Sequence, residues 1–340
     1  MVFGMFLYPF ITVRLKKTAL KKNTKKPKVT VIIPVYNEEK LISSKLENIL
    51  SLDYPKNKLD IIVVENGSTD ETAEAAKKFP VRLLHSSKGK IRAINKGLKC
   101  SNTDIVITTD VDVKLSKNSI ESLVSCFTEG IGAVNGYIIG QAMNPFTKQK
   151  ETYKKADWEL RYEEGLMDTA CSLDGKLMAF RKSIIPQIPK DALVDDYILT
   201  LLMREKGYRS VVDKEAQVYE PLSENMYSEI KQFKRFAITG LITNFKNIHF
   251  LFNPRYGYFG MMTFPFRRFF PIFYPVFLVY IIIYLFFINP VISVSVLGLG
   301  FFFLLMFKRL ILIQLIAVIT AYPQLFMKKN LKGGSWNTIR

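Results

Sequence analysis

The residues with the clearest chemical potential are two aspartates that follow an apolar run. Asp110 and Asp112 lie two positions apart, directly after Ile105–Thr109, which has the composition of a buried strand. Two carboxylates at a strand end can bind a hard divalent cation and leave positions open for the oxygens of a diphosphate. The same D-x-D pattern also occurs in ordinary polar turns, so the pattern alone leaves both interpretations open.

A second acidic position closes another apolar run. Glu65 follows Leu59–Val64, and Asn66–Gly67 then form a turn before Ser68 and Thr69, which are favoured helix N-caps. A carboxylate at this place can accept hydrogen bonds from a nucleobase or a ribose. The alternative is a plain turn followed by a capped helix.

A third acidic feature is the pair Asp195–Asp196, just before a predicted helix. Neighbouring like charges raise the pKa of one partner, which can bring a carboxyl group into the range of a general base. Acidic residues are also common in the first turn of a helix, where they interact favourably with its dipole. From the residues alone, catalysis and capping both remain open for Asp196.

The elements that must position these residues alternate between strand and helix. Strands are predicted at residues 29–33, 59–64, 81–84, 105–109, 133–139, 177–180 and 209–212. The helix that carries Asp196 is predicted at residues 196–206. Fully apolar strands alternating with helices indicate an α/β fold with a mainly parallel sheet covered on both faces. Ligands of such sheets bind beyond the carboxyl ends of the strands, where the acidic residues lie.

Composition divides the chain into a soluble part and an apolar part. The predicted regions are an apolar anchor with a basic linker at 1–28, a catalytic domain at 29–227, an amphipathic region at 228–268, transmembrane helices within 269–327 and a basic tail at 328–340. The candidate spans are residues 269–288, 291–307 and 310–327, since about 20 apolar residues cross a bilayer. Whether two or three of them span is left open by the sequence.

The formal net charge of +18 has a particular placement. Many of the basic residues flank the apolar segments: Lys16, Lys17, Lys21, Lys22, Lys25, Lys26 and Lys28 after the first, and Lys328, Lys329 and Lys332 after the last. This placement favours contact with membrane lipids, because cytoplasmic flanks of membrane segments are enriched in Lys and Arg. No basic helix or RNA-binding motif accompanies the charge, so nucleic acid is not an expected partner.

The cysteines and histidines show no sequence pattern typical of a disulfide framework or a metal site. Cys100, Cys126 and Cys171 are widely spaced and form no C-x-x-C motif, which argues against a disulfide framework and a zinc site. His85 and His249 lie far apart in the sequence, and ordinary surface or packed histidines are expected. These features fit a catalytic domain in the reducing cytoplasm.

A series of short motifs follows one order along the chain. They are Ile32–Glu39, Val64–Asp70, Gly89–Lys90 with Ala93–Gly97, Asp110–Asp112, Gly175 with Ala179–Arg181, Val194–Asp196, Lys206–Tyr208, Gln232–Phe236 and Trp336–Arg340. This set resembles family 2 glycosyltransferases, in particular the membrane-bound branch of cellulose, chitin, hyaluronan and poly-N-acetylglucosamine synthases. The resemblance covers roughly residues 30–239 and the tail.

The resemblance implies a Rossmann-like GT-A domain that binds a nucleotide-diphosphate sugar, followed by C-terminal transmembrane helices. It implies a donor site formed by Pro34, Tyr36, Glu38, Glu65, Lys90, Asp110, Gln232 and Arg235. Asp112, together with Asp110, would hold Mg²⁺ or Mn²⁺. Asp196 would be the general base that activates the acceptor hydroxyl for inversion. Gly175, Asp195 and Phe236 would lie on the acceptor side.

The chain departs from the family pattern at several positions. Asn66 replaces an acidic residue, although Glu65 keeps the acidic position before it. Val194 and Asp195 replace Thr and Glu, and Phe236 replaces a Trp and so lacks the indole donor. The few predicted spans also differ from polymer-conducting synthases. Together these departures leave processive synthesis and single addition both open.

The expected function is inverting, metal-dependent transfer of a sugar, from a UDP-sugar by the family resemblance, to a polysaccharide or lipid-linked acceptor. One alternative is addition of a single sugar to a polyprenyl or dolichol phosphate carrier. Another is a non-catalytic membrane scaffold that keeps the fold. The protein is expected to be an integral protein of the cell membrane, with its catalytic domain in the cytoplasm.

Overall fold

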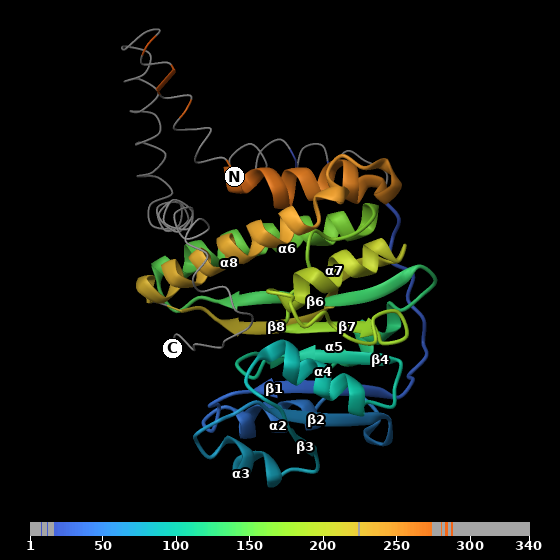
Figure 1. Ribbon diagram of the computed structural model, residues 1–340. Helices are drawn as coiled ribbons and strands as arrows, with labels where there is room; N and C mark the ends of the chain where they lie inside the picture. The colour runs from blue at the N-terminus through green and yellow to red at the C-terminus, as the bar shows by residue number, and fades with distance from the viewer. Residues whose placement is uncertain are drawn as a thin grey trace.

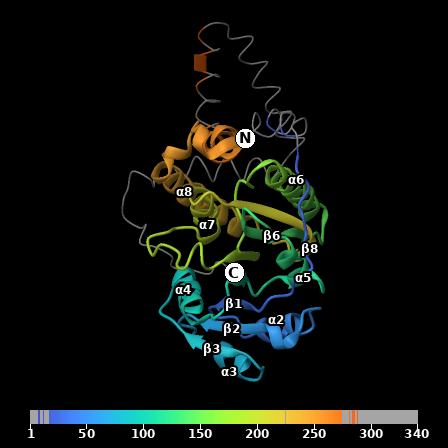
Figure 2. The same cartoon turned by 90° about the vertical axis from the view of Figure 1, so that its right-hand side faces the viewer.

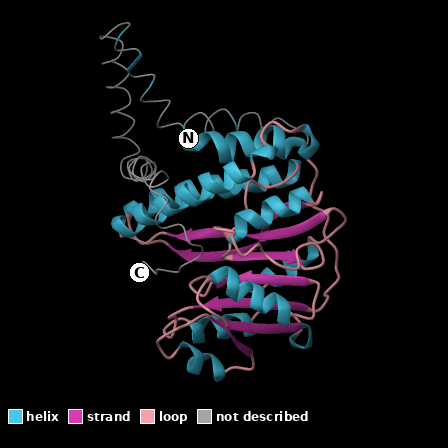
Figure 3. Ribbon diagram, viewed as in Figure 1, coloured by secondary structure: helices cyan, strands magenta, loops and turns pink. Residues whose placement is uncertain are grey.

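A single sheet organises the part of the chain that the structure describes (Figures 1 and 3). The computed structural model describes residues 17–223 and 225–273, together with Tyr8, Thr12, Tyr280, Ile283, Tyr284 and Phe287. The sheet has eight strands in the order β3-β2-β1-β4-β7-β6-β8-β5. Helices cover it on both faces.

The first half of the sheet is the parallel α/β unit that the sequence predicts. Its elements are β1 (Val29–Val35), α2 (Ile42–Leu50), η1 (Lys56–Lys58), β2 (Leu59–Glu65), α3 (Thr72–Lys77), β3 (Arg82–His85), α4 (Lys90–Cys100) and β4 (Ile105–Thr109). β1 pairs in parallel with β2 and with β4, and β2 pairs in parallel with β3. Alternate β1 residues face opposite cores: Val31 and Ile33 pack on the α2 side, whereas Ile32 packs on the α4 side.

The second half of the sheet corrects the prediction of a mainly parallel sheet. Its elements are β5 (Lys114–Leu115), α5 (Ser119–Ser125), β6 (Ile131–Gln141), α6 (Pro145–Met167), β7 (Leu177–Arg181), α7 (Asp195–Glu205) and β8 (Arg209–Pro221). β7 is antiparallel to both β4 and β6, and β5 is antiparallel to β8. The sheet is therefore mixed. Residues 168–176 return the chain to the edge where β4 ends, so β7 begins with Leu177 paired with Thr109, the last residue of β4.

Helices with many aromatic residues follow the sheet. They are α8 (Met226–Lys246), η2 (Ile248–Phe250), η3 (Pro254–Tyr256), the π-helix η4 (Phe259–Phe269) and η5 (Phe270–Phe273). Phe250, Phe259 and Phe264 form a buried cluster with Tyr197 and Leu201 of α7. This cluster attaches the region predicted to be amphipathic to the helix that carries Asp196.

Among the described residues, no helix combines the length and the apolar character needed to cross a bilayer. The predicted spans at 291–307 and 310–327 and the basic tail lie outside the described residues, as does most of 274–288.

The basic linker lies along the domain rather than apart from it. Residues 17–28, here called the basic strap, appear as the blue trace that passes the α6 and α5 side of the sheet in Figure 2. Its ion pairs are Lys17–Glu163 at 2.5 Å, Lys22–Asp213 at 3.0 Å, Lys22–Glu215 at 2.7 Å and Lys26–Glu121 at 2.7 Å. Part of the charge that the sequence associates with a membrane is thus paired with carboxylates of the domain.

Candidate active site

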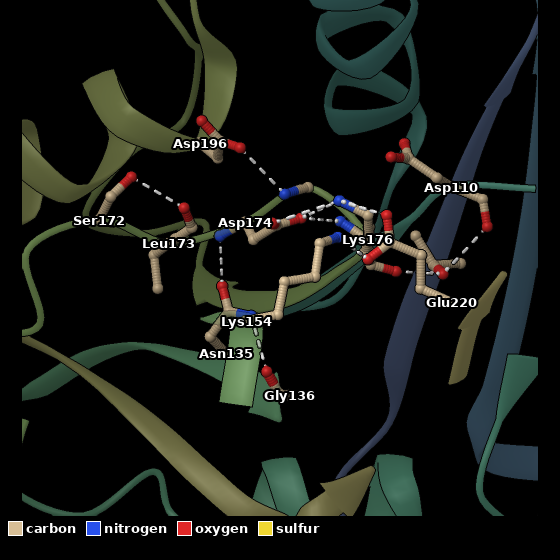
Figure 4. Close-up of polar contacts among 12 residues, drawn as sticks. Asp110, Asn135, Gly136, Lys154, Ser172, Leu173, Asp174, Lys176, Asp196 and Glu220 are labelled. Carbon is tan, nitrogen blue, oxygen red and sulfur yellow. Dashed lines mark hydrogen bonds and ion pairs between the residues drawn. The ribbon is translucent and has the colours of Figure 1, made fainter. Parts of the chain in front are cut away.

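The topology brings the predicted functional segments to one edge of the sheet. β1, β2 and β4 are parallel neighbours, so their carboxyl ends, which precede Tyr36, Asn66 and Asp110, meet at that edge. β7 begins at the same edge, which places Gly175 next to the Asp110 segment. Figure 4 shows the acidic and basic side chains that gather there.

Two loops at this edge are hydrogen-bonded to each other. Asn37 adopts a left-handed conformation with φ of 55°, and its side-chain oxygen accepts a hydrogen bond from the Thr69 amide at 2.8 Å. The Asn37 amide in turn donates to the Ser68 hydroxyl at 3.0 Å. The Lys88 ammonium group donates to the Tyr36 hydroxyl at 3.0 Å and lies 4.5 Å from the centre of its ring. Lys88 is a site candidate that sequence reasoning missed.

Glu65 is held as an ionised acceptor between these loops. Its carboxylate accepts hydrogen bonds from the Ser68 amide and, at 3.0 Å, from Nδ1 of His85. Burial opposes ionisation, but these hydrogen bonds outweigh it and lower the pKa of Glu65. Glu38 is 3% exposed, and its amide donates to Thr72 at 2.7 Å. Pro34 lies within β1 opposite Val64.

Asn66 explains one departure from the family pattern. It is fully buried, and its side-chain amide donates to the Val35 carbonyl at 2.9 Å while its oxygen accepts from the Gly89 amide at 3.0 Å. An ionised aspartate has no donor for the Val35 carbonyl. Asn66 therefore joins the end of β1 to the start of α4, which carries Lys90.

Lys90 links Asp110, at the end of β4, to α7, the helix that begins with Asp195 and Asp196. Its ammonium group lies 2.8 Å from Asp110 and 3.4 Å from Asp195. Burial disfavours the charge, but the two carboxylates outweigh burial and raise the pKa of Lys90 well above its ordinary value. The structure thus places Lys90 between Asp110 and α7, a more specific position than the donor site that the family resemblance implies.

Asp196 lies directly across from the loop before β7. Its carboxylate accepts hydrogen bonds from the Gly175 amide at 3.1 Å and from its neighbour's amide, that of Tyr197, at 2.6 Å. Burial and the adjacent carboxylates of Asp195 and Asp174 raise the pKa of Asp196 to about 7, and Lys90 opposes this shift. This is the range in which a carboxylate can accept a proton from a hydroxyl during catalysis.

The backbone of Gly175 lies close to Lys90 and to the two carboxylates at the start of α7. A Cβ atom at position 175 would lie 2.6 Å from the Lys90 ammonium nitrogen and 3.5 Å from Asp195. Any larger residue would displace the lysine or the loop. The predicted acceptor-side residue Gly175 is therefore a fixed part of the site's wall.

A group of charged residues that the sequence did not single out completes the wall (Figure 4). Lys176 lies 3.3 Å from Asp174 and 3.6 Å from Glu220 of β8, and Lys154 of α6 pairs with the same glutamate. Although burial opposes ionisation, Lys176 and Arg161 lower the pKa of Asp174 to about 2. Asp174 and Lys176 flank Gly175 and could have been found from that motif, whereas nothing local to Lys154 or Glu220 distinguishes them.

The Asp110–Asp112 segment fits a divalent cation that is shared with a diphosphate. Asp110 is half-buried and Asp112 is exposed at the edge of the sheet. Within the described residues no group of three or more potential ligand side chains comes together. Two carboxylates suffice for Mg²⁺, which usually keeps water and substrate phosphate oxygens as its other ligands. The residues present therefore fit a metal that arrives with its nucleotide.

The predicted residues of α8 are not joined to this cluster. Gln232, Arg235 and Phe236 are exposed, and the Arg235 guanidinium group lies 5.3 Å from the ring of Phe236. The described side chains show no hydrogen bond between Gln232 or Arg235 and Asp110 or Asp196. The assignment of Gln232 and Arg235 to the donor site stays a prediction.

Cys100, Cys126 and Cys171 are free. His85 contacts Glu65, and His249 lies 3.9 Å from Glu205.

Comparison with known families identifies the domain around this edge. Residues 30–188 match the model of glycosyl transferase family 2. This match assigns residues 30–188 to a family 2 glycosyltransferase domain. The sequence-based prediction of a glycosyltransferase is confirmed for this domain, and its matched region contains Tyr36, Glu65, Lys90, Asp110 and the Gly175 loop.

Curated relatives agree with the family of the glycosyltransferase domain. The chain is 31% identical over 201 residues to a probable glycosyltransferase, YdaM, of Bacillus subtilis (strain 168), covering 54% of this chain and 48% of the relative. It is 25% identical over 232 residues to poly-beta-1,6-N-acetyl-D-glucosamine synthase of Staphylococcus aureus (strain COL), covering 62% and 54%. The chain thus spans about half the length of the curated relatives that it matches.

A solved structure supports the fold of the glycosyltransferase domain and its surroundings. The mannosyltransferase PcManGT from Pyrobaculum calidifontis, in complex with GDP-Man and Mn²⁺, aligns with a TM-score of 0.72 at 21% identity, covering 96% of each chain. The described part of this chain is therefore a GT-A-like α/β fold with a mixed sheet.

Proposed function

We propose that this protein is an inverting, metal-dependent glycosyltransferase in which Asp196 is the general base. The observation that carries the proposal is the position of Asp196, whose carboxylate faces the Gly175 amide at 3.1 Å beside the Lys90–Asp110 ion pair. The pKa of about 7 lets this carboxylate take the proton of an acceptor hydroxyl. The hydroxyl oxygen would then bond to the anomeric carbon on the face opposite the nucleotide diphosphate as the bond to that leaving group breaks, which inverts the configuration.

The donor is proposed to be a nucleotide-diphosphate sugar, with UDP as the nucleotide by family resemblance. Glu65, Tyr36 and the Asn37 loop offer acceptors and a ring for the base and ribose. Asp110 and Asp112 would hold Mg²⁺ or Mn²⁺, which supplies positive charge to the leaving diphosphate. Lys90 keeps Asp110 in place through its ion pair. Gln232 and Arg235 would close over the diphosphate, and Arg235 offers a fixed fork of donors.

The acceptor is proposed to be a growing polysaccharide or a lipid-linked glycan at the membrane. Support comes from the curated relative named as a poly-N-acetylglucosamine synthase and from the apolar sequence beyond residue 273. The catalytic domain is proposed to face the cytoplasm, with Phe236 and Asp195 near the acceptor. A scaffold without activity is disfavoured because Asp110, Asp112 and Asp196 are all present, and the raised pKa of Asp196 suits the proposed base.

The proposed function predicts selective, metal-dependent release of one nucleotide diphosphate. Purified protein should be assayed with Mg²⁺ or Mn²⁺ against a panel of UDP- and GDP-sugars and a lipid extract. We expect Asp112→Ala to lower release at least about tenfold, because one of the two metal-binding carboxylates is lost. A ladder of products would support repeated addition, whereas one product would support transfer of a single sugar to a lipid carrier.

The matched control for this assay is Asp53→Ala, which removes an exposed aspartate outside the site. It should retain the activity of the unmodified protein. Turnover that continues in excess chelator would refute the metal requirement, and absence of both nucleotide binding and release would favour the scaffold.

The raised pKa of Asp196 predicts a pH dependence of transfer. Only the deprotonated carboxylate acts as a base, so the rate at saturating donor should rise about tenfold per pH unit up to about pH 7 and then level off. An aspartate with an ordinary pKa would instead give a flat profile across this range. Measuring kcat from pH 5 to pH 9 distinguishes these cases, and a flat profile would show that the base does not have a raised pKa.

A further inference from the structure

A lysine lies buried beneath the segment that carries the two metal-binding aspartates. Lys45 belongs to α2 and is 2% exposed, on the same face as Ile42, Leu46 and Ile49. Lysines are seldom fully buried without partners, since removing the ammonium group from water costs free energy. An apolar residue would pack on this face at lower cost, so the lysine requires another explanation.

The contacts of Lys45 provide that explanation. Its ammonium group donates to the Thr109 hydroxyl and to the Val113 carbonyl, each at 2.9 Å. These two residues stand immediately before Asp110 and immediately after Asp112. The single Lys45 side chain is therefore attached to both ends of the short segment that carries the two carboxylates.

The next turn of α2 extends this attachment. Asn48 donates to the Leu115 carbonyl at 3.0 Å and accepts from the Leu115 amide at 2.8 Å. The Thr109 hydroxyl also donates to the Lys176 carbonyl at 2.7 Å, which links the segment to the Gly175 loop. Without Lys45, the buried Val113 carbonyl would lose a donor and Thr109 would lose one of its two attachments.

The charge of Lys45 is coupled to the same two aspartates. Burial lowers the pKa of Lys45 to about 7, and the carboxylates of Asp110 and Asp112 oppose this lowering. Lys45 is thus attracted to the pair from inside the domain, whereas Lys90 contacts Asp110 from the site itself.

We propose that Lys45 is a positioning residue that holds residues 109–113 in the conformation in which Asp110 and Asp112 can bind a divalent cation. The proposal rests on the proposed function, because it concerns the cation of that same site. Lys45 acts through Thr109 and Val113 and touches neither donor nor acceptor.

The test is the binding of Mn²⁺ and UDP, measured by calorimetry on the full chain without any turnover. Lys45→Met keeps the length of the side chain but removes its donors and charge. We expect the Mn²⁺ concentration that gives half-maximal UDP binding to rise about tenfold. This change corresponds to the net free energy of roughly one hydrogen bond, which would no longer hold the segment in its metal-binding conformation. UDP binding extrapolated to saturating Mn²⁺ should stay within about threefold.

Asn48→Ala is the matched control, because it frees the far end of the segment at Leu115 and leaves both aspartates attached. It is expected to lower thermal stability while changing the Mn²⁺ requirement less than about threefold. A general structural role for Lys45 would instead change stability in both variants and the Mn²⁺ requirement in neither.

A second variant keeps the proposal testable if Lys45→Met does not fold. Thr109→Val is nearly isosteric, removes an acceptor of Lys45 and leaves the lysine in place, so it should also raise the Mn²⁺ requirement. An unchanged or lowered requirement in the folded variants would overturn the role of Lys45. Failure of the unmodified protein to bind either UDP or GDP with Mn²⁺ would instead overturn the proposed function.

Discussion

Replacing Asp196 by asparagine is expected to lower the rate of sugar transfer by about 10³-fold at pH 8, where the unmodified carboxylate is ionised. The amide keeps the shape of the side chain and can still accept from the Gly175 amide, yet it cannot take a proton from the acceptor hydroxyl. Nucleotide binding should stay within about threefold, because Asp196 lies on the acceptor side of Lys90. Single-turnover kinetics together with UDP titration measure both quantities.

Asp191→Asn provides the comparison for this variant. Asp191 lies five positions earlier, is exposed and pairs with Lys246 at 2.9 Å, so its loss should leave transfer unchanged. If Asp196→Asn retained near-normal transfer while binding UDP, another group would have to accept the proton of the acceptor hydroxyl. The assignment of Asp196 as the base would then be wrong.

Replacing Lys90 by methionine is expected to lower transfer by about 100-fold at pH 7 and to move the pH profile to higher pH. Two effects combine. Asp110 and Asp195 lose the cation that lies 2.8 Å and 3.4 Å from them, and Asp196 loses the charge that opposes its raised pKa. Part of the lost rate should therefore return as the pH is raised. The pH dependence of kcat, measured beside thermal unfolding, separates the two effects.

Lys96→Met is the matched control, because Lys96 lies on the same helix and is exposed. It should change neither the rate nor the pH profile. A Lys90→Met protein that loses activity equally at every pH would show that the lysine contributes through structure or donor binding, without setting the protonation of Asp196.

Much of the site was predictable because its residues sit where strands end. The apolar runs before Tyr36, Glu65 and Asp110 mark parallel strands, and parallel strands bring their carboxyl ends together. The resemblance then added Gly175 and Asp196, which the structure places 3.1 Å apart. The roles of Gln232 and Arg235 on α8 stay predictions.

The direction of β7 and the internal partners of the site were not predictable in the same way. The run Leu177–Arg181 shows that a strand exists, but hydrophobic periodicity is the same for a parallel and an antiparallel neighbour. The long helix α6 was missed because its polar, lysine-rich residues give only a weak amphipathic pattern. Lys45 and Glu220 contribute through contacts with residues far along the chain, for which a single sequence contains no signal.

The basic strap has a consequence for how the chain is made. Residues 17–28 leave the ribosome before the rest of the domain, yet Lys22 pairs with Glu215, 193 positions further on. The strap also contacts the first half of the sheet, where Tyr54 donates to the Pro27 carbonyl at 2.6 Å. The C-terminal end of the strap can therefore dock as soon as the segment between α2 and β2 forms, while the ion pairs of the strap must wait for α5, α6 and β8. The first described segment to be synthesised is thus among the last to reach its final place.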